Sequence, residues 1–179
     1  DNEDNKSENR KEYEEMSTMF NNIIKLPIGD KYIGEIKNNL PNGKGKYYSN
    51  DGTIREGIFI DGLLCGYGKI LYPGGEQYEG ELLNEKPNGK GKYLNGKGEF
   101  YEGNFKNGVR EGKGLLFLDN KNIYEGNFIN GKLEGEGKYR NDEGEEYIGE
   151  FKNGKIEGKG KKTWKSGIEY VGDFFDGLE

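Results

Sequence analysis

Glycine recurs in this chain with a period of 23 residues, and this feature limits the possible folds more than any other. The chain has 179 residues, of which 32 are glycine. When units are counted from residues 32, 55, 78, 101, 124, 147 and 170, 30 of these glycines fall at positions 3, 8, 12, 14 and 21. Flexible linkers have no such phase, so the glycines mark a backbone requirement that each unit repeats. The chain is therefore predicted to contain six complete repeats and a half repeat.

Composition restricts the kind of repeat. The chain has no alanine, the strongest helix former, and this argues against a helical repeat. Charged residues make up 34% of it, but 13 Tyr, 9 Phe and 1 Trp are too many aromatic residues for a disordered chain. The repeats should therefore be folded and rich in β-structure.

Each unit is predicted to be a β-hairpin, with strands at roughly positions 1–6 and 13–18. A turn rich in Gly, Asn and Pro joins them, for example Asn107-Gly108 or Pro87-Asn88-Gly89. A second turn at positions 19–22, such as Asn50–Gly52, leads to the next hairpin. Successive hairpins then form a meander of about 13 strands, roughly 60 Å long at about 4.8 Å per strand.

Strand alternation assigns the side chains to two faces. Positions 1, 3 and 5 share one face and carry an aromatic residue, Gly, and Phe, Leu or Ile. An aromatic ring beside a glycine can cover the neighbouring backbone, which replaces a second layer of structure. We expect this face to be concave. The other face carries rows of Glu and Lys and is predicted to be a solvated surface, interrupted by a small apolar patch of Ile58, Ile60, Leu71, Leu83 and Leu94.

The unit Y-x-G-x-F-x-x-G-x-x-x-G-x-G-x-Y resembles the MORN repeat (membrane occupation and recognition nexus). The pattern covers residues 32–179, with departures at Arg55, Asn39, Glu85 and Lys162. The resemblance implies an all-β fold, a single-layer twisted antiparallel meander of hairpins with an open groove. MORN proteins serve as scaffolds at cytoskeleton–membrane junctions or as accessory modules of larger enzymes. Some bind a helix in the groove, and some dimerise through C-terminal repeats.

Residues 1–31 lie outside the repeats and form a polar N-terminal segment. Tyr13, Met16, Phe20 and Ile23 have helical spacing, which predicts a short α-helix over residues 7–24. Pro27 and Gly29 end the segment. This helix is expected to cap the first hairpin or to occupy the groove of its own or another chain. A membrane or partner helix is a further alternative.

Catalytic chemistry is not expected. The chain has no His, so a Ser–His–Asp or Cys–His arrangement cannot be built, and the single cysteine, Cys65, has no partner for a disulfide or a metal site. Phosphate-binding glycine motifs are missing despite the many glycines. We therefore predict a protein that is not an enzyme, with no cofactor, no metal and no catalytic residue.

The function that fits best is a scaffold or adaptor that binds a protein partner, an amphipathic helix in the first instance, along an aromatic groove. The alternatives are an accessory module of a larger enzyme and an anchor to acidic phospholipids. Aromatic side chains are common interface anchors. The candidate contact residues are Tyr78, Tyr101, Phe105, Tyr124, Phe128, Tyr147, Phe151 and Trp164.

Charge limits the other partners. The net charge of −6 argues against nucleic acid. Residues 32–179 carry 22 basic and 25 acidic groups, whereas lipid binding calls for a basic cluster. We expect a cytoplasmic protein, cytoskeletal or associated with the cortical membrane. A homodimer through the C-terminal sheet edge is a further expectation.

Overall fold

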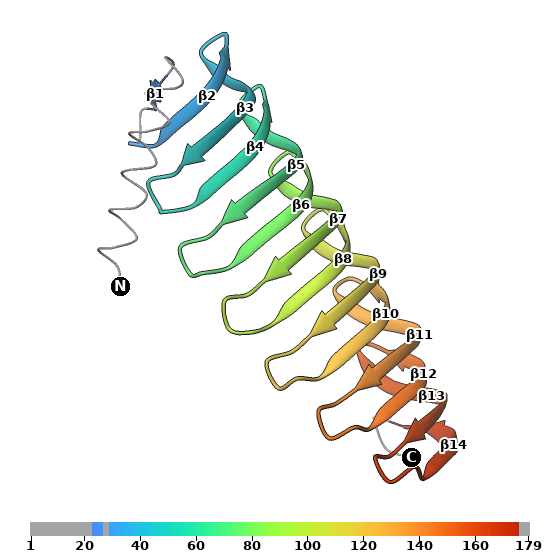
Figure 1. The fold of residues 1–179 in the computed structure, drawn as a ribbon. Coiled ribbons are helices and arrows are strands. Elements are labelled where there is room, and N and C mark those ends of the chain that lie inside the picture. Colours follow the sequence, from blue (N-terminus) through green and yellow to red (C-terminus); the bar gives the residue numbers. More distant parts are fainter. Residues whose placement is uncertain (1–22, 27–28, 176–179) are drawn as a thin grey trace.

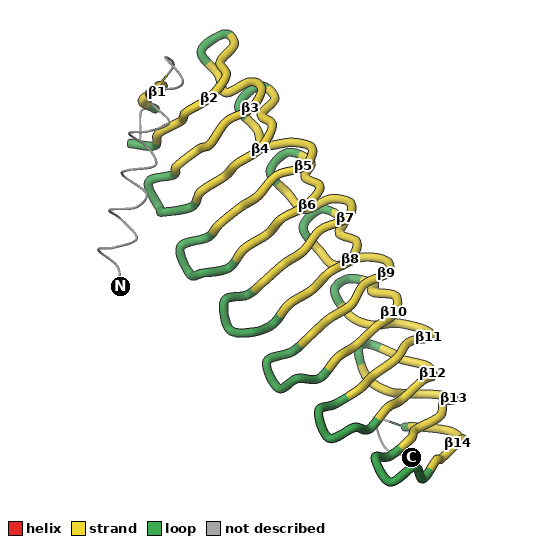
Figure 2. The backbone as a smooth tube through the Cα atoms, in the orientation of Figure 1, coloured by secondary structure: helices red, strands yellow, loops and turns green. Residues whose placement is uncertain are grey.

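The computed structural model describes residues 23–26 and 29–175. They form one open antiparallel sheet in which fourteen strands follow each other in chain order (Figure 1). The described residues contain strands, turns and loops but no helix (Figure 2). The strands are β1 (Ile23–Lys25), β2 (Lys31–Lys37), β3 (Leu40–Tyr48), β4 (Ile54–Ile60), β5 (Leu63–Leu71), β6 (Gln77–Leu83), β7 (Lys86–Leu94), β8 (Phe100–Lys106), β9 (Val109–Phe117), β10 (Ile123–Ile129), β11 (Lys132–Arg140), β12 (Glu146–Lys152), β13 (Lys155–Thr163) and β14 (Glu169–Phe174). The single antiparallel meander predicted from the repeat is confirmed, with β2–β14 as its thirteen strands.

Strand β1 comes before the repeats and corrects the end of the predicted helix. Ile23 pairs with Ile33, and Ile24 pairs with Tyr32, along the outer edge of β2. The predicted helix over residues 7–24 is therefore wrong at its last two residues, and the rest of it lies outside the described residues. Two β-branched side chains favour the extended backbone, and the free edge of β2 offers hydrogen bonds to it.

The first turn of each unit is shorter than the sequence suggested. It contains only positions 7 and 8, both with positive φ, as in Asn107 (50°) and Gly108 (85°). This is the backbone of a two-residue hairpin turn, which Asn-Gly favours. The second strand therefore begins at position 9, and the expected turn residues Pro87-Asn88-Gly89 lie inside β7.

A β-bulge in each hairpin accounts for this difference. In the fourth unit Gly103 pairs with Gly114, but the next pair is Phe105 with Arg110. Three residues of β9 therefore stand opposite the single residue Asn104. The middle one, Gly112, has a φ of 90°, which explains why position 12 is glycine in every unit. The bulge bends the hairpin, and the bend separates a half near the two-residue turn from a half near the four-residue turn.

Paired glycines run across the whole sheet. Positions 3 and 14 face each other at every boundary between repeat strands, so that each of the thirteen strands contributes one glycine. We call this row the glycine ladder; its members in order are Gly34, Gly45, Gly57, Gly68, Gly80, Gly91, Gly103, Gly114, Gly126, Gly137, Gly149, Gly160 and Gly172.

Tyrosine rings cover the ladder on one side of the sheet. A Cβ atom at Gly114 would lie 2.5 Å from Cε2 and Cζ of Tyr101, which is fully buried. The hydroxyl of Tyr101 donates to the carbonyl of Asn104, the bulged residue, over 3.0 Å. Tyr32, Tyr78, Tyr147 and Tyr170 make the equivalent bond at 2.7–3.2 Å. The ring thus fills the space above two glycines and satisfies a carbonyl that the bulge leaves outside the regular pairing.

Leucine replaces this ring in the second and fifth units. Leu64 Cδ1 is 3.0 Å from the Cβ position of Gly57, and Leu133 Cδ1 is 3.0 Å from that of Gly126. Arg55 heads the second unit in place of Tyr, and Leu64 compensates for the missing ring. In the fifth unit Tyr124 packs against Tyr139 instead, with ring centroids 4.9 Å apart.

The core is one continuous row of these side chains along a single face. It includes the rings at positions 1 and 5 and the aliphatic residues at position 10, and its partly buried rim includes position 16. Neighbouring hairpins are also joined at their two-residue turns, since Gly108 N donates to the Pro87 carbonyl at 2.8 Å and four other units repeat this bond. The result is a single layer in which each unit contacts mainly its neighbours.

Candidate interaction surfaces

The eight aromatic residues singled out from the sequence lie on this core face, which we call the aromatic face. Six of them are at most 7% exposed. They pack edge to face, as Tyr101 does against Phe105 and Phe128, with centroids 5.1 and 5.2 Å apart. Only Tyr124 and Trp164 are half-buried. The six buried residues are Tyr78, Tyr101, Phe105, Phe128, Tyr147 and Phe151, and in this structure they offer a partner little surface.

A second set of aromatic residues, near the four-residue turns, is more accessible. These residues occupy positions 16 and 18, and position 16 is aromatic in odd units and position 18 in two of the three even units. All are half-buried, and Leu118 takes the place of a ring in the fourth unit. We call this set the ring row, and it consists of Tyr47, Tyr72, Tyr93, Leu118, Tyr139 and Trp164. Sequence reasoning selected only Trp164 from it, although the alternation between positions 16 and 18 is visible in the sequence.

The ring row is held in place by its surroundings. The hydroxyl of Tyr47 donates to the Asp30 carboxylate at 2.7 Å, and Arg55 lies 5.8 Å from the centre of the Tyr47 ring. Burial raises the pKa of the Tyr47 hydroxyl well above its usual value, and the bond to Asp30 raises it further. Glu85 pairs with Arg55 at 3.4 Å. The exposed ring edges are therefore part of a fixed surface.

The aromatic face has one hollow, of about 440 Å³, among the described residues of its C-terminal units. Tyr124 and Tyr139 line it together with Lys162, which replaces the aromatic or aliphatic residue of position 16. The ammonium of Lys162 lies 4.8 Å from the centre of the Trp164 ring. Glu145 and Glu146 complete the rim. A hollow of this size takes one or two side chains of a partner.

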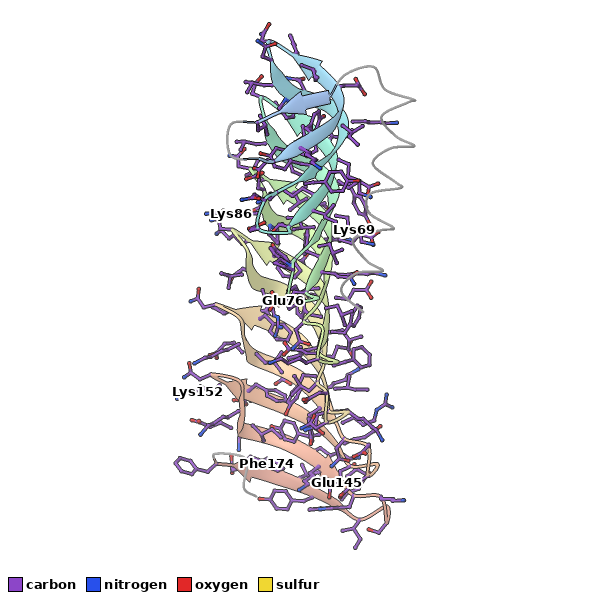
Figure 3. All side chains as sticks on the ribbon, turned by 90° about the vertical axis from the view of Figure 1, so that its left-hand side faces the viewer. Lys69, Glu76, Lys86, Glu145, Lys152 and Phe174 are labelled. Atoms are coloured by element: carbon purple, nitrogen blue, oxygen red, sulfur yellow. The ribbon has the colours of Figure 1, made fainter. Side chains whose placement is uncertain are left out.

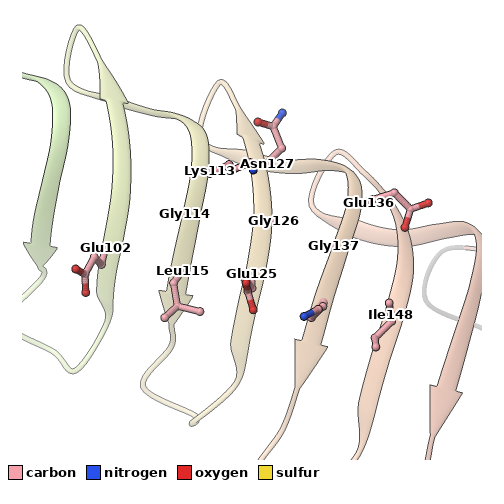
Figure 4. A pocket seen from close by; sticks show the side chains of 11 residues that line it. Glu102, Lys113, Gly114, Leu115, Glu125, Gly126, Asn127, Glu136, Gly137 and Ile148 are labelled. Atoms are coloured by element: carbon pink, nitrogen blue, oxygen red, sulfur yellow. The ribbon is translucent and has the colours of Figure 1, made fainter.

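The opposite face, which we call the charged face, also carries a groove. Three hollows of about 720, 400 and 280 Å³ lie on it and share the lining residues Tyr67, Glu102 and Lys113. Figure 4 shows the largest hollow, with the glycine ladder between two rows of side chains. Lys46–Glu56 and Lys92–Glu102 form ion pairs at 3.6 Å along one row. The larger hollows therefore lie on this face, whereas the expected aromatic groove is mostly filled by its own rings.

Exposed lysine and aliphatic side chains alternate along the two-residue turns. They occupy positions 6 and 9, which pair across each turn. In the six complete units all twelve are exposed, none is acidic, and Lys152 pairs with Glu157 at 3.2 Å. Lys86 and Lys152 project from the same edge in Figure 3. We call this the tip stripe, and it consists of Lys37, Leu40, Ile60, Leu63, Leu83, Lys86, Lys106, Val109, Ile129, Lys132, Lys152 and Lys155.

The described residues give little support for reaction chemistry. No group of three or more Cys, Asp or Glu residues in them is arranged to hold a metal ion. Cys65 is partly buried in β5, and its thiol lies 3.8 Å from Asn84. No helix among the described residues is long and apolar enough to cross a membrane. Binding surfaces are therefore the main functional features of this sheet.

Comparison with known proteins agrees with the repeat. A family model for the MORN repeat matches residues 32–54, 56–77, 78–100, 101–122, 124–145 and 147–168. These six matches follow the six complete units counted from the glycines. No curated protein matches the sequence.

Solved structures share only the general form of the sheet. The Drosophila melanogaster SAS-4 (dCPAP) TCP domain, solved in complex with a proline-rich motif of Ana2 (dSTIL), is 16% identical with a TM-score of 0.42 over 84% of this chain and 88% of that one. The G-box domain of the microcephaly protein CPAP is 12% identical with a TM-score of 0.42 over 84% and 97%. The TCP10 domain of Danio rerio CPAP is 9% identical with a TM-score of 0.34 over 88% and 100%. At this level of likeness we base no argument about partners on these proteins.

Proposed function

The chain belongs to the MORN-repeat family, and we propose that it is a non-enzymatic scaffold that binds a segment of another protein along the ring row. The observation that carries the proposal is the ring row itself, six half-buried side chains, five of them aromatic, spread over six repeats. Tyr and Trp supply much of the binding energy at protein interfaces. A row of them that keeps part of each ring accessible is therefore a suitable binding surface.

Rigidity strengthens this proposal. Each strand from β2 to β13 pairs with a neighbour on both sides, and the two-residue turns are bonded to one another. A surface that is ordered before binding loses little conformational entropy when the partner arrives. The scaffold would present its rings in fixed order, and the partner segment would adapt to them.

Finer assignments remain proposals. We propose an amphipathic helix as one occupant, with the hollow between Tyr124 and Tyr139 taking an anchor side chain. The cytoplasmic face of a cytoskeleton–membrane junction is the proposed location, as the family suggests. An accessory role within a larger enzyme is the alternative.

Affinity capture from extract of the native cell tests the scaffold proposal. Wild-type protein, Tyr139→Ala and the control Tyr67→Ala are compared by quantitative mass spectrometry. Tyr67 is 63% exposed on the charged face and makes a hydrogen bond to Glu79. We expect a set of proteins that Tyr67→Ala retains and Tyr139→Ala loses. Equal capture by all three proteins would contradict the proposal.

The tip stripe favours a second candidate, attachment to an anionic membrane. Six lysines alternate with six exposed aliphatic residues, so these lysines differ from those on the charged face that pair with Glu. A lysine close to an anionic bilayer contributes about 1 kcal/mol. In liposome flotation at physiological salt, we expect phosphatidylserine vesicles to carry the wild type. Lys86→Gln should reduce this more than the control Lys97→Gln. No flotation with anionic lipid would rule out this candidate.

Self-association is proposed at the end of the sheet. β14 pairs with β13 on one side only among the described strands, and Val171 and Phe175 are 74% and 76% exposed there. An exposed strand edge with apolar side chains pairs readily with a second chain. Light scattering should then show a dimer, which Val171→Lys weakens. A monomeric mass at high protein concentration would exclude it.

A further inference from the structure

We infer that the ring row binds a proline-rich segment in the polyproline II conformation. This inference rests on the proposed scaffold function and specifies the class of partner. It follows from three properties of the aromatic face, namely the axial spacing of its repeats, the chemistry of its exposed rings and the charge of its border.

The axial spacing of the repeats matches one turn of polyproline II. Each unit adds two strands, so equivalent positions recur at about 9.6 Å along the sheet, taking about 4.8 Å per strand. A polyproline II helix has three residues per turn at about 3.1 Å each, which gives about 9.3 Å. Every third residue of such a segment therefore meets an equivalent site in the next unit.

Other backbone conformations match this spacing less well. An α-helix returns to the same face after seven residues, or about 10.5 Å, so its mismatch is about 0.9 Å per unit. The mismatch of polyproline II is about 0.3 Å per unit, and over four units it stays near 1 Å while that of the helix passes 3 Å. A β-strand advances about 9.9 Å in three residues, but its residues i and i+3 point to opposite sides.

The exposed rings suit this occupant chemically. Tyr47 stacks near Phe59 at an angle of 28° with centroids 6.4 Å apart, and Tyr139 lies 4.9 Å from Tyr124. These contacts hold each ring at a fixed tilt, and proline rings pack well on fixed aromatic surfaces. Polyproline II makes no internal hydrogen bonds, so its carbonyls are free to accept from tyrosine hydroxyls and from the Trp164 indole N–H.

The border of the ring row is acidic. Glu76, Glu99 and Glu145 occupy the same position, 22, of the four-residue turns in the second, third and fifth units. Glu99 pairs with Arg110, while Glu145 also borders the hollow beside Tyr139. Figure 3 labels Glu76 and Glu145 on the aromatic side chain assembly. A matching partner therefore carries Arg or Lys between its prolines.

Two synthetic peptides of identical composition test the register. One has proline at every third position, the other at every fourth, with Arg, Ser and Gln between, and both carry fluorescein for anisotropy titration. We expect the first to bind at least tenfold more tightly. Equal affinities, or binding of neither peptide at high micromolar protein, would overturn the inference.

Variants locate the peptide on the sheet. Tyr93→Ala and Tyr139→Ala should each weaken binding of the first peptide at least tenfold, and Tyr67→Ala should leave it unchanged. Glu145→Gln, which leaves the rings intact, should weaken it severalfold and lower its salt dependence. Circular dichroism confirms folding of each variant. Equal loss in Tyr67→Ala, or no loss in Glu145→Gln together with Tyr139→Ala, would contradict the assignment.

The two proposals fail in different ways. If native proteins are captured by wild type and lost by Tyr139→Ala, but neither peptide binds, the scaffold function stands and the proline-rich partner is wrong. If Tyr139→Ala captures the same proteins as wild type and neither peptide binds, both proposals are wrong.

Discussion

Replacing one glycine of the ladder by alanine tests how this sheet folds as a single layer. Gly114 lies in β9 with a φ that suits any residue, so Gly114→Ala introduces only the steric effect of a methyl group. The new Cβ would lie 2.5 Å from two ring carbons of Tyr101, which is fully buried and cannot turn toward solvent. The ring must therefore shift, and its bond to Asn104 must lengthen or break.

The expected cost follows from these contacts. Overpacking of a buried site costs about 1–3 kcal/mol. Loss of the Tyr101 hydrogen bond adds about 1 kcal/mol. Alanine also restricts the unfolded chain, which returns about 0.4–1 kcal/mol. We expect Gly114→Ala to lower the free energy of unfolding by about 2 kcal/mol.

Urea unfolding followed by circular dichroism measures this change. The matched control is Gly74→Ala, because Gly74 lies outside the ladder with no atom within 4 Å of its Cβ position. Its free energy of unfolding should stay within about 0.5 kcal/mol of wild type. In the double variant Gly114→Ala with Tyr101→Ala, the alanine methyl group fills vacated space, so the two costs should not add. Equal stability of Gly114→Ala and Gly74→Ala would refute the role of the ladder.

Three further results are expected. Tyr101→Phe should destabilise the protein by about 1 kcal/mol in urea unfolding, because the Asn104 carbonyl loses its partner; the exposed Tyr67→Phe should cost less, and equal costs would count against the bulge bond. Gly108→Ala should cost about 1 kcal/mol or more, since the turn holds Gly108 at a φ of 85°; an unchanged urea midpoint would contradict this. Burial raises the pKa of Tyr32 and Tyr101 to about 12, above the unfolded value of about 10, so their contribution is complete below pH 10 and lost between pH 10 and 12. Ultraviolet titration of tyrosine should therefore follow unfolding in that range, and ionisation of all tyrosines near pH 10 in the folded protein would contradict it.

The glycine phase was sufficient to predict the sheet. Glycines at positions 3 and 14 could only be required in every unit if the strands paired in one register, and the structure shows that register. The bulge could not be read in the same way. Pro87-Asn88-Gly89 has the composition of a turn, but the pairing of Pro87 with Leu82 places it in a strand. Local composition does not distinguish a turn from a bulge when both need a glycine with positive φ.

Burial was the property that sequence reasoning placed least well. Tyr101 and Tyr139 are both tyrosines on the aromatic face, but the first is buried by Phe105 and Phe128 while the second keeps an exposed edge. That difference depends on the direction in which each ring lies along its strand, which the residue type does not specify. Similarly, Ile60 and Leu83 were grouped with the charged face, but they belong to the tip stripe because the bulge changes the alternation of faces.

Site-specific photo-crosslinking tests the central claim, that a protein partner lies on the ring row, most directly. A benzophenone amino acid is placed at position 93 in one sample and at position 67, on the opposite face, in another, and each is irradiated in native cell extract. We expect protein adducts at position 93 that excess unlabelled wild type suppresses, and none of the same adducts at position 67. Adducts confined to position 67, or the same adducts at both positions, would contradict binding on the aromatic face.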